Sequence, residues 1–145
     1  MKKINWPVKT KLPIQWGDMD AFSHVNNVIY IRWFETARIE LFTELWGGNG
    51  INLQEILDGD GVGPILANFN INYHLPLLYP DTVHINTRIS KVGNSSFGVS
   101  HQLFSKNNGN KMIASADSIV VMYNYQKGEK FLLNEQLKNA LNKFK

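Results

Sequence analysis

The chain has no cysteine and no long uninterrupted hydrophobic stretch. The lack of thiols excludes disulfide bonds, cysteine zinc sites and a cysteine nucleophile. No apolar stretch approaches the roughly 20 residues that a membrane-spanning helix requires. In the first ten residues, MKKINWPVKT, Asn5 and Pro7 interrupt the continuous apolar segment that an export signal would carry. These absences predict a soluble, cytoplasmic protein without a membrane span.

The chain also has little excess charge of one sign. Fifteen Lys and Arg residues against twelve Asp and Glu residues give a net charge of +3, and the cations are dispersed rather than gathered into a stripe. Nucleic acid is therefore not an expected partner. The length of 145 residues, with 43% hydrophobic residues and no internal repeat or linker, predicts one globular domain over residues 1–145.

The clearest helical pattern covers residues 28–46. Its apolar positions recur at spacings of four and three, and they are Tyr30, Phe34, Ala37, Leu41 and Leu45. This spacing predicts one long amphipathic helix that packs along the core. Asn26 or Asn27 can cap its first turn, and Gly47 and Gly48 can end it. Arg38 lies near the apolar edge of the helix, where we expect it to pair with Glu35.

Alternating apolar and polar residues predict five strands. The predicted strands are residues 8–16, 64–75, 81–92, 95–105 and 111–125, and short helical segments are expected at 52–58 and 134–144. The short gaps between the later strands favour an antiparallel meander. We therefore expect an α+β fold with a five-stranded antiparallel sheet around one long helix. Because one helix cannot cover both sheet faces, we also expect a dimer or higher oligomer, formed by edge pairing.

The residues best suited to chemistry lie directly before the long helix, in WGDMDAFSHVNN (residues 16–27). A helix N-terminus presents unpaired amide groups that can stabilise a developing oxyanion. An ionised aspartate beside those amides could act as a general base or as a nucleophile. Such aspartates also cap turns without any catalytic role. A metal site made by Asp18, Asp20 and His24 is a further alternative, although no helical pair of histidines supports it.

The segment WGDMDAFSHVNNVIYIRWFETARIELF resembles the signature of hotdog-fold acyl-CoA thioesterases of the 4-hydroxybenzoyl-CoA thioesterase-like family. The resemblance continues through INYHLPLLYPDTVHINTRISKVGNSSFGVSHQLF and ASADSIVVMYNYQKGE, so it covers roughly residues 8–130. It implies a hotdog fold, in which the sheet wraps a central helix and the chains form a homodimer or a homotetramer.

The resemblance also implies roles for residues in the loop. In one branch of the family the first Asp of the G-D-x-D pattern is the catalytic carboxylate, which corresponds to Asp18. In other members the Asp lies at the second position, which corresponds to Asp20. The resemblance implies that His24 orients the reacting groups and that the amide of Val25 polarises the thioester carbonyl. Asn26 and Asn27 would then organise the turn.

The implied reaction is hydrolysis of an acyl-CoA or acyl-carrier-protein thioester to a carboxylic acid and a free thiol, with no cofactor. Candidates for the acyl pocket are Phe22, Tyr30, Phe34, Phe69 and Tyr73, each of which could equally be core. Candidates for contacts with the CoA phosphates are Arg88 and Lys91, then Lys106 and Lys111, each of which could equally lie on a solvated sheet face.

Two other functions remain open from the sequence. Hotdog hydratases and dehydratases carry a D-x-N-P-x-H pattern, which this chain lacks before His24. A non-catalytic acyl-CoA-binding protein would keep the fold without turnover. Measured release of free thiol distinguishes the thioesterase from both.

Overall fold

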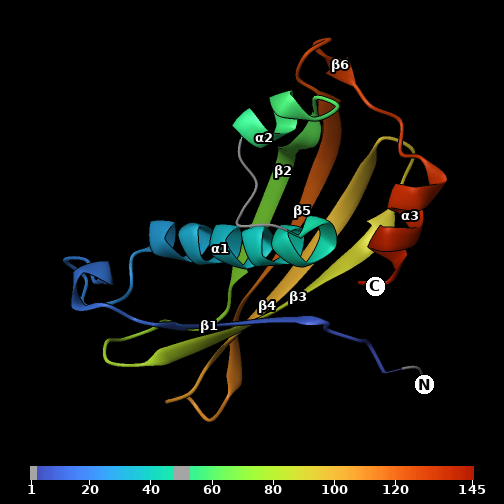
Figure 1. Cartoon of the computed structure of the whole chain (residues 1–145). Helices are drawn as coiled ribbons and strands as arrows, with labels where there is room; N and C mark the ends of the chain where they lie inside the picture. The colour runs from blue at the N-terminus through green and yellow to red at the C-terminus, as the bar shows by residue number, and fades with distance from the viewer. Residues whose placement is uncertain (1–2, 48–52) are drawn as a thin grey trace.

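The computed structural model describes residues 3–47 and 53–145, and Figure 1 shows how the elements are arranged. The strands are β1 (Val8–Pro13), β2 (Val62–Tyr73), β3 (Thr82–Val92), β4 (Ser96–Ser105), β5 (Lys111–Asn124) and β6 (Glu129–Lys130). The helical segments are the 3-10 turn η1 (Trp16–Asp18), α1 (Asn27–Trp46), α2 (Leu53–Asp58) and α3 (Glu135–Asn142). The predicted α+β fold is confirmed, and β6 is a short addition to the five expected strands.

The strands form one antiparallel sheet in the order β1-β3-β4-β5-β2, with β6 beside β5. The predicted meander holds for β3, β4 and β5, but β2 lies at the far edge of this path. Residues 74–81 connect β2 to β3 and run past the start of α1, where the Leu77 carbonyl accepts a hydrogen bond from the Val25 N–H at 2.9 Å. This connection brings the end of β2 next to the beginning of the helix.

Helix α1 begins and ends with the residues that the sequence suggested. The Asn26 side chain accepts a hydrogen bond from the Val28 N–H at 3.1 Å, which caps the first turn. At the other end Gly47 has φ +72°, a conformation that favours glycine. The predicted partner Gly48 lies outside the described residues. Figure 1 shows α1 lying across one face of the sheet.

The core consists of two hydrophobic clusters that share α1. The first packs Tyr30, Trp33 and Phe34 from the first half of the helix against β3, β4 and β5. The second packs Leu41 and Phe42 from the second half against the sheet and α3. Since α1 contributes to both clusters, its first turn is held at a fixed place relative to the strand ends.

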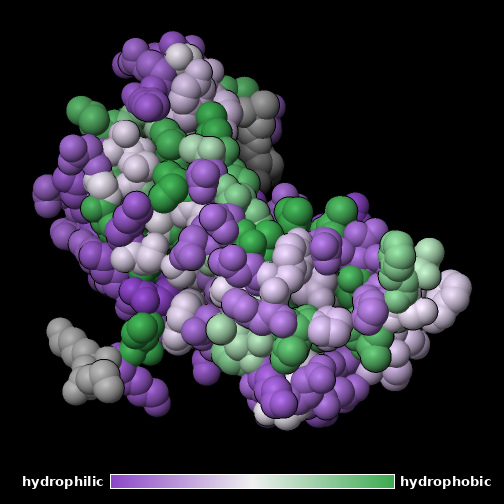
Figure 2. All heavy atoms as spheres, turned by 180° about the vertical axis from the view of Figure 1, so that it is seen from behind, coloured by the Kyte–Doolittle hydropathy of each residue, from purple (hydrophilic) through white to green (hydrophobic). Residues whose placement is uncertain are grey.

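The face of the sheet turned away from α1 is largely polar. There the Ser100 hydroxyl donates a hydrogen bond to the Asp117 carboxylate at 2.6 Å, joining β4 to β5. Figure 2 shows this side, with hydrophilic atoms over much of it and hydrophobic atoms scattered among them. In residues 3–47 and 53–145, no helix has the length and apolar character needed to cross a membrane.

Candidate active site

A hollow of about 550 Å³ lies where α1 begins and β2 ends. The residues that line it are Asp20, Phe22, His24, Val25, Asn26, Asn27, Tyr30, Tyr73, His74, Leu75 and Pro76. Eight of these are among the residues that the sequence predicted for catalysis or substrate binding. The loop before the helix and the distant end of β2 therefore meet at one place.

The loop that carries Asp20 is closed by its own hydrogen bonds. The Asp20 N–H donates to the His24 carbonyl at 2.9 Å, and one carboxylate oxygen, Oδ1, accepts from the Phe22 N–H at 2.9 Å. Ser23 has φ +63°, which allows the chain to reverse between these bonds. An Asx turn of this kind explains why short polar residues occupy the segment. It also fixes the direction of the carboxylate of Asp20, a residue that lines the hollow.

Asp18 has a different position. Its side chain accepts a hydrogen bond from the Gln15 N–H at 2.8 Å and so stabilises η1. Its carbonyl accepts from the Asn26 N–H at 2.9 Å. Asp18 is not among the residues that line the hollow. Of the two aspartates in the G-D-x-D pattern, the structure brings Asp20 to the cavity and uses Asp18 to support the loop and the helix start.

The backbone amides at the start of α1 are nearly all paired. The Val25 N–H, predicted to polarise the thioester, donates to the Leu77 carbonyl, and the Asn26 N–H donates to Asp18. The Val28 N–H donates to the Asn26 side chain, and the Ile29 N–H donates to the Asn26 carbonyl. Within residues 25–29, all of them described, this leaves only the N–H of Asn27 without a hydrogen-bond partner. Asn27 is also part of the lining of the hollow.

Two tyrosines, Tyr30 and Tyr73, form an aromatic wall of the hollow. Their rings meet edge to face, with centroids 5.0 Å apart and an interplanar angle of 83°. Burial raises the pKa of Tyr30 to about 12, with a smaller contribution from the nearby Tyr73. Burial also raises the pKa of Tyr73. Both phenols therefore stay neutral near pH 7. Neither can act as a base there, but each retains an O–H donor.

Several predicted binding residues lie away from the hollow. Phe34 is fully buried in the core and packs against Phe69 at a ring-centroid distance of 6.1 Å. Arg88 lies on β3 with its guanidinium 5.6 Å from the centre of the Trp6 ring, and Lys91 lies near the end of the same strand. None of Phe34, Phe69, Arg88 and Lys91 lines the hollow.

Sequence reasoning did not single out His74, Leu75 and Pro76, which also line the hollow. The His74 Nε2 atom lies 3.1 Å from the Ser115 hydroxyl oxygen, and the His74 N–H donates to the Ile113 carbonyl at 2.8 Å. These residues follow the last residue of β2 directly. No local motif marks them, because their place at the site depends on the pairing of β2 with β5.

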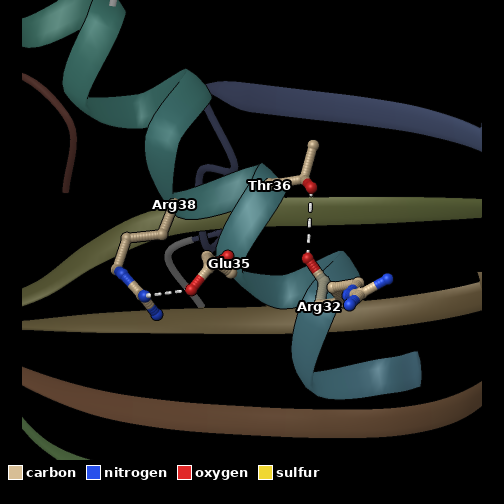
Figure 3. A network of polar contacts seen from close by, with 4 residues as sticks. All are labelled: Arg32, Glu35, Thr36 and Arg38. Carbon is tan, nitrogen blue, oxygen red and sulfur yellow. Dashed lines mark hydrogen bonds and ion pairs between the residues drawn. The ribbon is translucent and has the colours of Figure 1, made fainter. Parts of the chain in front are cut away.

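The predicted Arg38–Glu35 pair is present on α1. One guanidinium nitrogen of Arg38 lies 4.0 Å from a Glu35 carboxylate oxygen, and Figure 3 shows the two side chains pointing toward each other. The same view shows the Thr36 hydroxyl donating to the Arg32 carbonyl, one turn earlier, at 3.1 Å. Arg38 is buried although Glu35 is exposed. This pairing supports a structural role for Arg38.

The metal site suggested as an alternative for Asp18, Asp20 and His24 finds no support in the arrangement of these groups. Over the described ranges, no cluster of three or more His, Asp or Glu side chains has an arrangement that could hold a metal ion.

Comparison with known proteins identifies the class to which this fold belongs. The sequence model of the thioesterase-like superfamily matches residues 14–141, and the chain belongs to that superfamily. It is 23% identical over 136 residues to the long-chain acyl-CoA thioesterase FadM of Escherichia coli, with 92% of this chain and 96% of the relative covered.

Two further proteins extend the comparison. The chain is 25% identical over 111 residues to the 1,4-dihydroxy-2-naphthoyl-CoA hydrolase of Crocosphaera subtropica, with 77% of this chain and 78% of the relative covered. A DHNA-CoA thioesterase from Staphylococcus aureus has a similar solved structure, with a TM-score of 0.77 at 16% identity, covering 94% of this chain and 89% of the other. The fold is therefore that of the hotdog thioesterases.

Proposed function

We propose that this chain is an acyl-CoA thioesterase that works at the hollow between α1 and β2. One observation carries the proposal: Asp20, which bears a carboxylate, and Asn27, whose N–H is unpaired, line the same hollow. A carboxylate and an oxyanion donor are the two groups that thioester hydrolysis needs. Membership of the thioesterase-like superfamily, and relatives named as CoA-thioester hydrolases, support this choice.

In the proposed reaction the thioester carbonyl oxygen accepts a hydrogen bond from the Asn27 N–H. This amide lies at the positive end of the α1 dipole, so it stabilises the negative charge that develops on that oxygen. The Asp20 carboxylate either removes a proton from a water that attacks the carbonyl carbon or attacks that carbon itself. The C–S bond then breaks. On the first route the water oxygen ends on the acyl carbon and one proton ends on the sulfur. On the second route breaking the C–S bond leaves an acyl anhydride on Asp20, and a water then cleaves this anhydride, which releases the carboxylic acid, restores the carboxylate and supplies the proton for the sulfur. One water is consumed by either route.

We propose that His24 also helps to orient the reacting groups. His24 is exposed at the cavity, and its carbonyl accepts the Asp20 N–H, so it helps to fix the loop that presents the carboxylate. The aromatic lining from Phe22, Tyr30 and Tyr73 offers apolar contacts for the acyl group. The two named relatives act on a long-chain acyl-CoA and on a naphthoyl-CoA. Both kinds of acyl group therefore belong in the test panel.

We also propose that the active form is a homodimer joined through β2. Among the strands that the structure describes, β2 pairs with β5 alone, so its other edge is open to pairing with a further strand. The apolar side chain of Leu66 is exposed on this strand, and the side chains of Ile31 and Ile39 are exposed on α1. An unprotected edge beside exposed apolar residues favours pairing with a second copy. Light scattering should therefore give twice the chain mass, and Leu66→Lys should shift the protein toward monomer.

Release of free thiol from a panel of acyl-CoA esters tests the proposed activity. The panel should contain short, medium and long aliphatic groups and aromatic groups such as benzoyl. Turnover of at least one ester well above its spontaneous hydrolysis is expected. Binding of these esters without any thiol release would contradict the proposal and would favour a non-catalytic binding protein.

A further inference from the structure

Tyr73 joins the last position of β2 to the first residue of α1. Its hydroxyl donates a hydrogen bond to the Asn27 carbonyl at 2.9 Å, across 46 residues of sequence. Asn27 is the residue whose own N–H is unpaired and lines the hollow. The contact therefore links the sheet to the residue that supplies the proposed oxyanion donor.

The first residue of a helix is held less firmly than residues further along. No preceding helical turn accepts its N–H, so only its flanking bonds fix its backbone angles. For Asn27, the preceding peptide is anchored because the Asn26 carbonyl accepts a hydrogen bond from the Ile29 N–H at 2.9 Å. The Tyr73 hydroxyl anchors the carbonyl on the other side of the same Cα. Fixing both neighbouring peptides fixes the direction of the Asn27 N–H.

The Tyr73 ring is itself held in place. It contacts the ring of Tyr30 edge to face at 5.0 Å, and Tyr30 is a buried residue of α1. A tyrosine hydroxyl is protonated at neutral pH and can donate, and burial raises the pKa of Tyr73 further. The ring contact and the hydroxyl contact are separable, since a phenylalanine at this position keeps the first and loses the second.

We propose that Tyr73 is a positioning residue for the reaction: its hydroxyl acts through the Asn27 peptide, while its ring alone contacts the acyl group. The inference rests on the proposed thioesterase function. It assigns the Tyr73 hydroxyl a role distinct from the acyl-pocket role that its aromatic character first suggested. Misdirection of an oxyanion donor weakens stabilisation of the transition state more than binding of the ground state.

The test compares Tyr73→Phe with a matched control, Tyr125→Phe. The Tyr125 hydroxyl also donates to a backbone carbonyl, that of Pro64 at 2.8 Å, and its ring also meets another tyrosine, Tyr123, edge to face at 5.3 Å. Tyr125 is not part of the hollow. For Tyr73→Phe we expect kcat to fall about tenfold, less than the 10²–10³ typical for complete loss of a donor. Its KM should stay within about twofold, because the substrate contact is kept. Tyr125→Phe should leave both constants unchanged.

Amide hydrogen exchange supplies a readout that does not depend on turnover. Tyr73→Phe should speed exchange in the first turn of α1, including Asn27, whereas Tyr125→Phe should not. An unchanged kcat, a raised KM with unchanged kcat, or equal losses in both variants would each overturn the inference. A wild-type chain inactive on every ester would instead overturn the proposed function, and the exchange rates would still test whether Tyr73 holds the Asn27 peptide.

Discussion

The Thr87 hydroxyl oxygen and the Nδ1 atom of His101 lie 2.8 Å apart on neighbouring strands beneath α1. His101 is 1% exposed, and its ring lies 5.2 Å from the ring of Phe34 at an interplanar angle of 37°. Burial, with a further contribution from the positive charge of Arg38, lowers the pKa of His101 to about 3. The imidazole is therefore neutral in the folded protein over the whole range in which an exposed histidine titrates.

This buried histidine predicts that the protein loses stability in mild acid. The pKa of His101 in the unfolded chain is near 6.5, so between about pH 6.5 and pH 3 the unfolded chain binds a proton that the folded chain excludes. The contribution of the neutral His101 imidazole to the free energy of unfolding is complete above pH 6.5. Below that pH it falls by up to about 1.4 kcal/mol for each pH unit. Urea denaturation at pH 7 and pH 5 measures the difference.

The matched variants for this pH effect are His101→Gln and His84→Gln. His101→Gln removes the titrating group and should flatten the dependence of the free energy of unfolding on pH. His84 lies outside the core clusters, so His84→Gln should leave this dependence as in the wild type. An identical slope in the wild type and in His101→Gln would contradict the assignment.

Asn27→Pro deletes the proposed oxyanion donor with little damage to the helix. Asn27 is the first residue of α1, a position where proline is favoured because its missing N–H has no helical partner. Asn26 precedes it with φ −60° and ψ 135°, a conformation that suits a residue before proline. We expect kcat to fall by about 10²–10³. Asn27→Ala keeps the N–H and should retain most activity, and equal activity of the two variants would exclude this amide.

Phe34→Leu distinguishes core packing from substrate contact. Since the Phe34 ring is fully buried and does not line the hollow, the smaller side chain should lower the free energy of unfolding by about 1–2 kcal/mol. The KM for a good acyl-CoA substrate should stay within about twofold, because the cavity lining is unchanged. A selective rise in KM without loss of stability would indicate that Phe34 contacts the acyl group.

Local chemistry explains why much of the fold could be predicted. Alternation in segments such as 81–92 predicts a strand because successive side chains face opposite sides of a sheet, and β3 is found there. Spacing and an Asn cap predict α1 within one residue of its observed start. Alternation predicts that a segment forms a strand, but it does not predict which strands pair with it. The place of β2 at the far edge could therefore not be derived from its own residues.

The candidate site was predictable only in part, for a similar reason. The concentration of Asp, Asn and Gly before α1 identified the loop, because these residues form turns and caps. Which aspartate faces the cavity depends on the turn that binds Asp18 to Gln15. The Val25 N–H is already hydrogen-bonded to the carbonyl of Leu77, which is 52 positions away in the sequence. Phe34 has the helical spacing of core and pocket alike, so spacing could not separate the two.

The most direct test of the central claim is the rate of thiol release by Asp20→Asn beside that of Asp18→Asn. Both substitutions keep the shape of the side chain and an oxygen that can accept the local backbone hydrogen bond, so each should preserve the loop. Asp20→Asn should lower kcat by at least about 10²-fold, while Asp18→Asn should retain activity within about tenfold of wild type. Loss of activity in Asp18→Asn with full activity in Asp20→Asn would contradict the account.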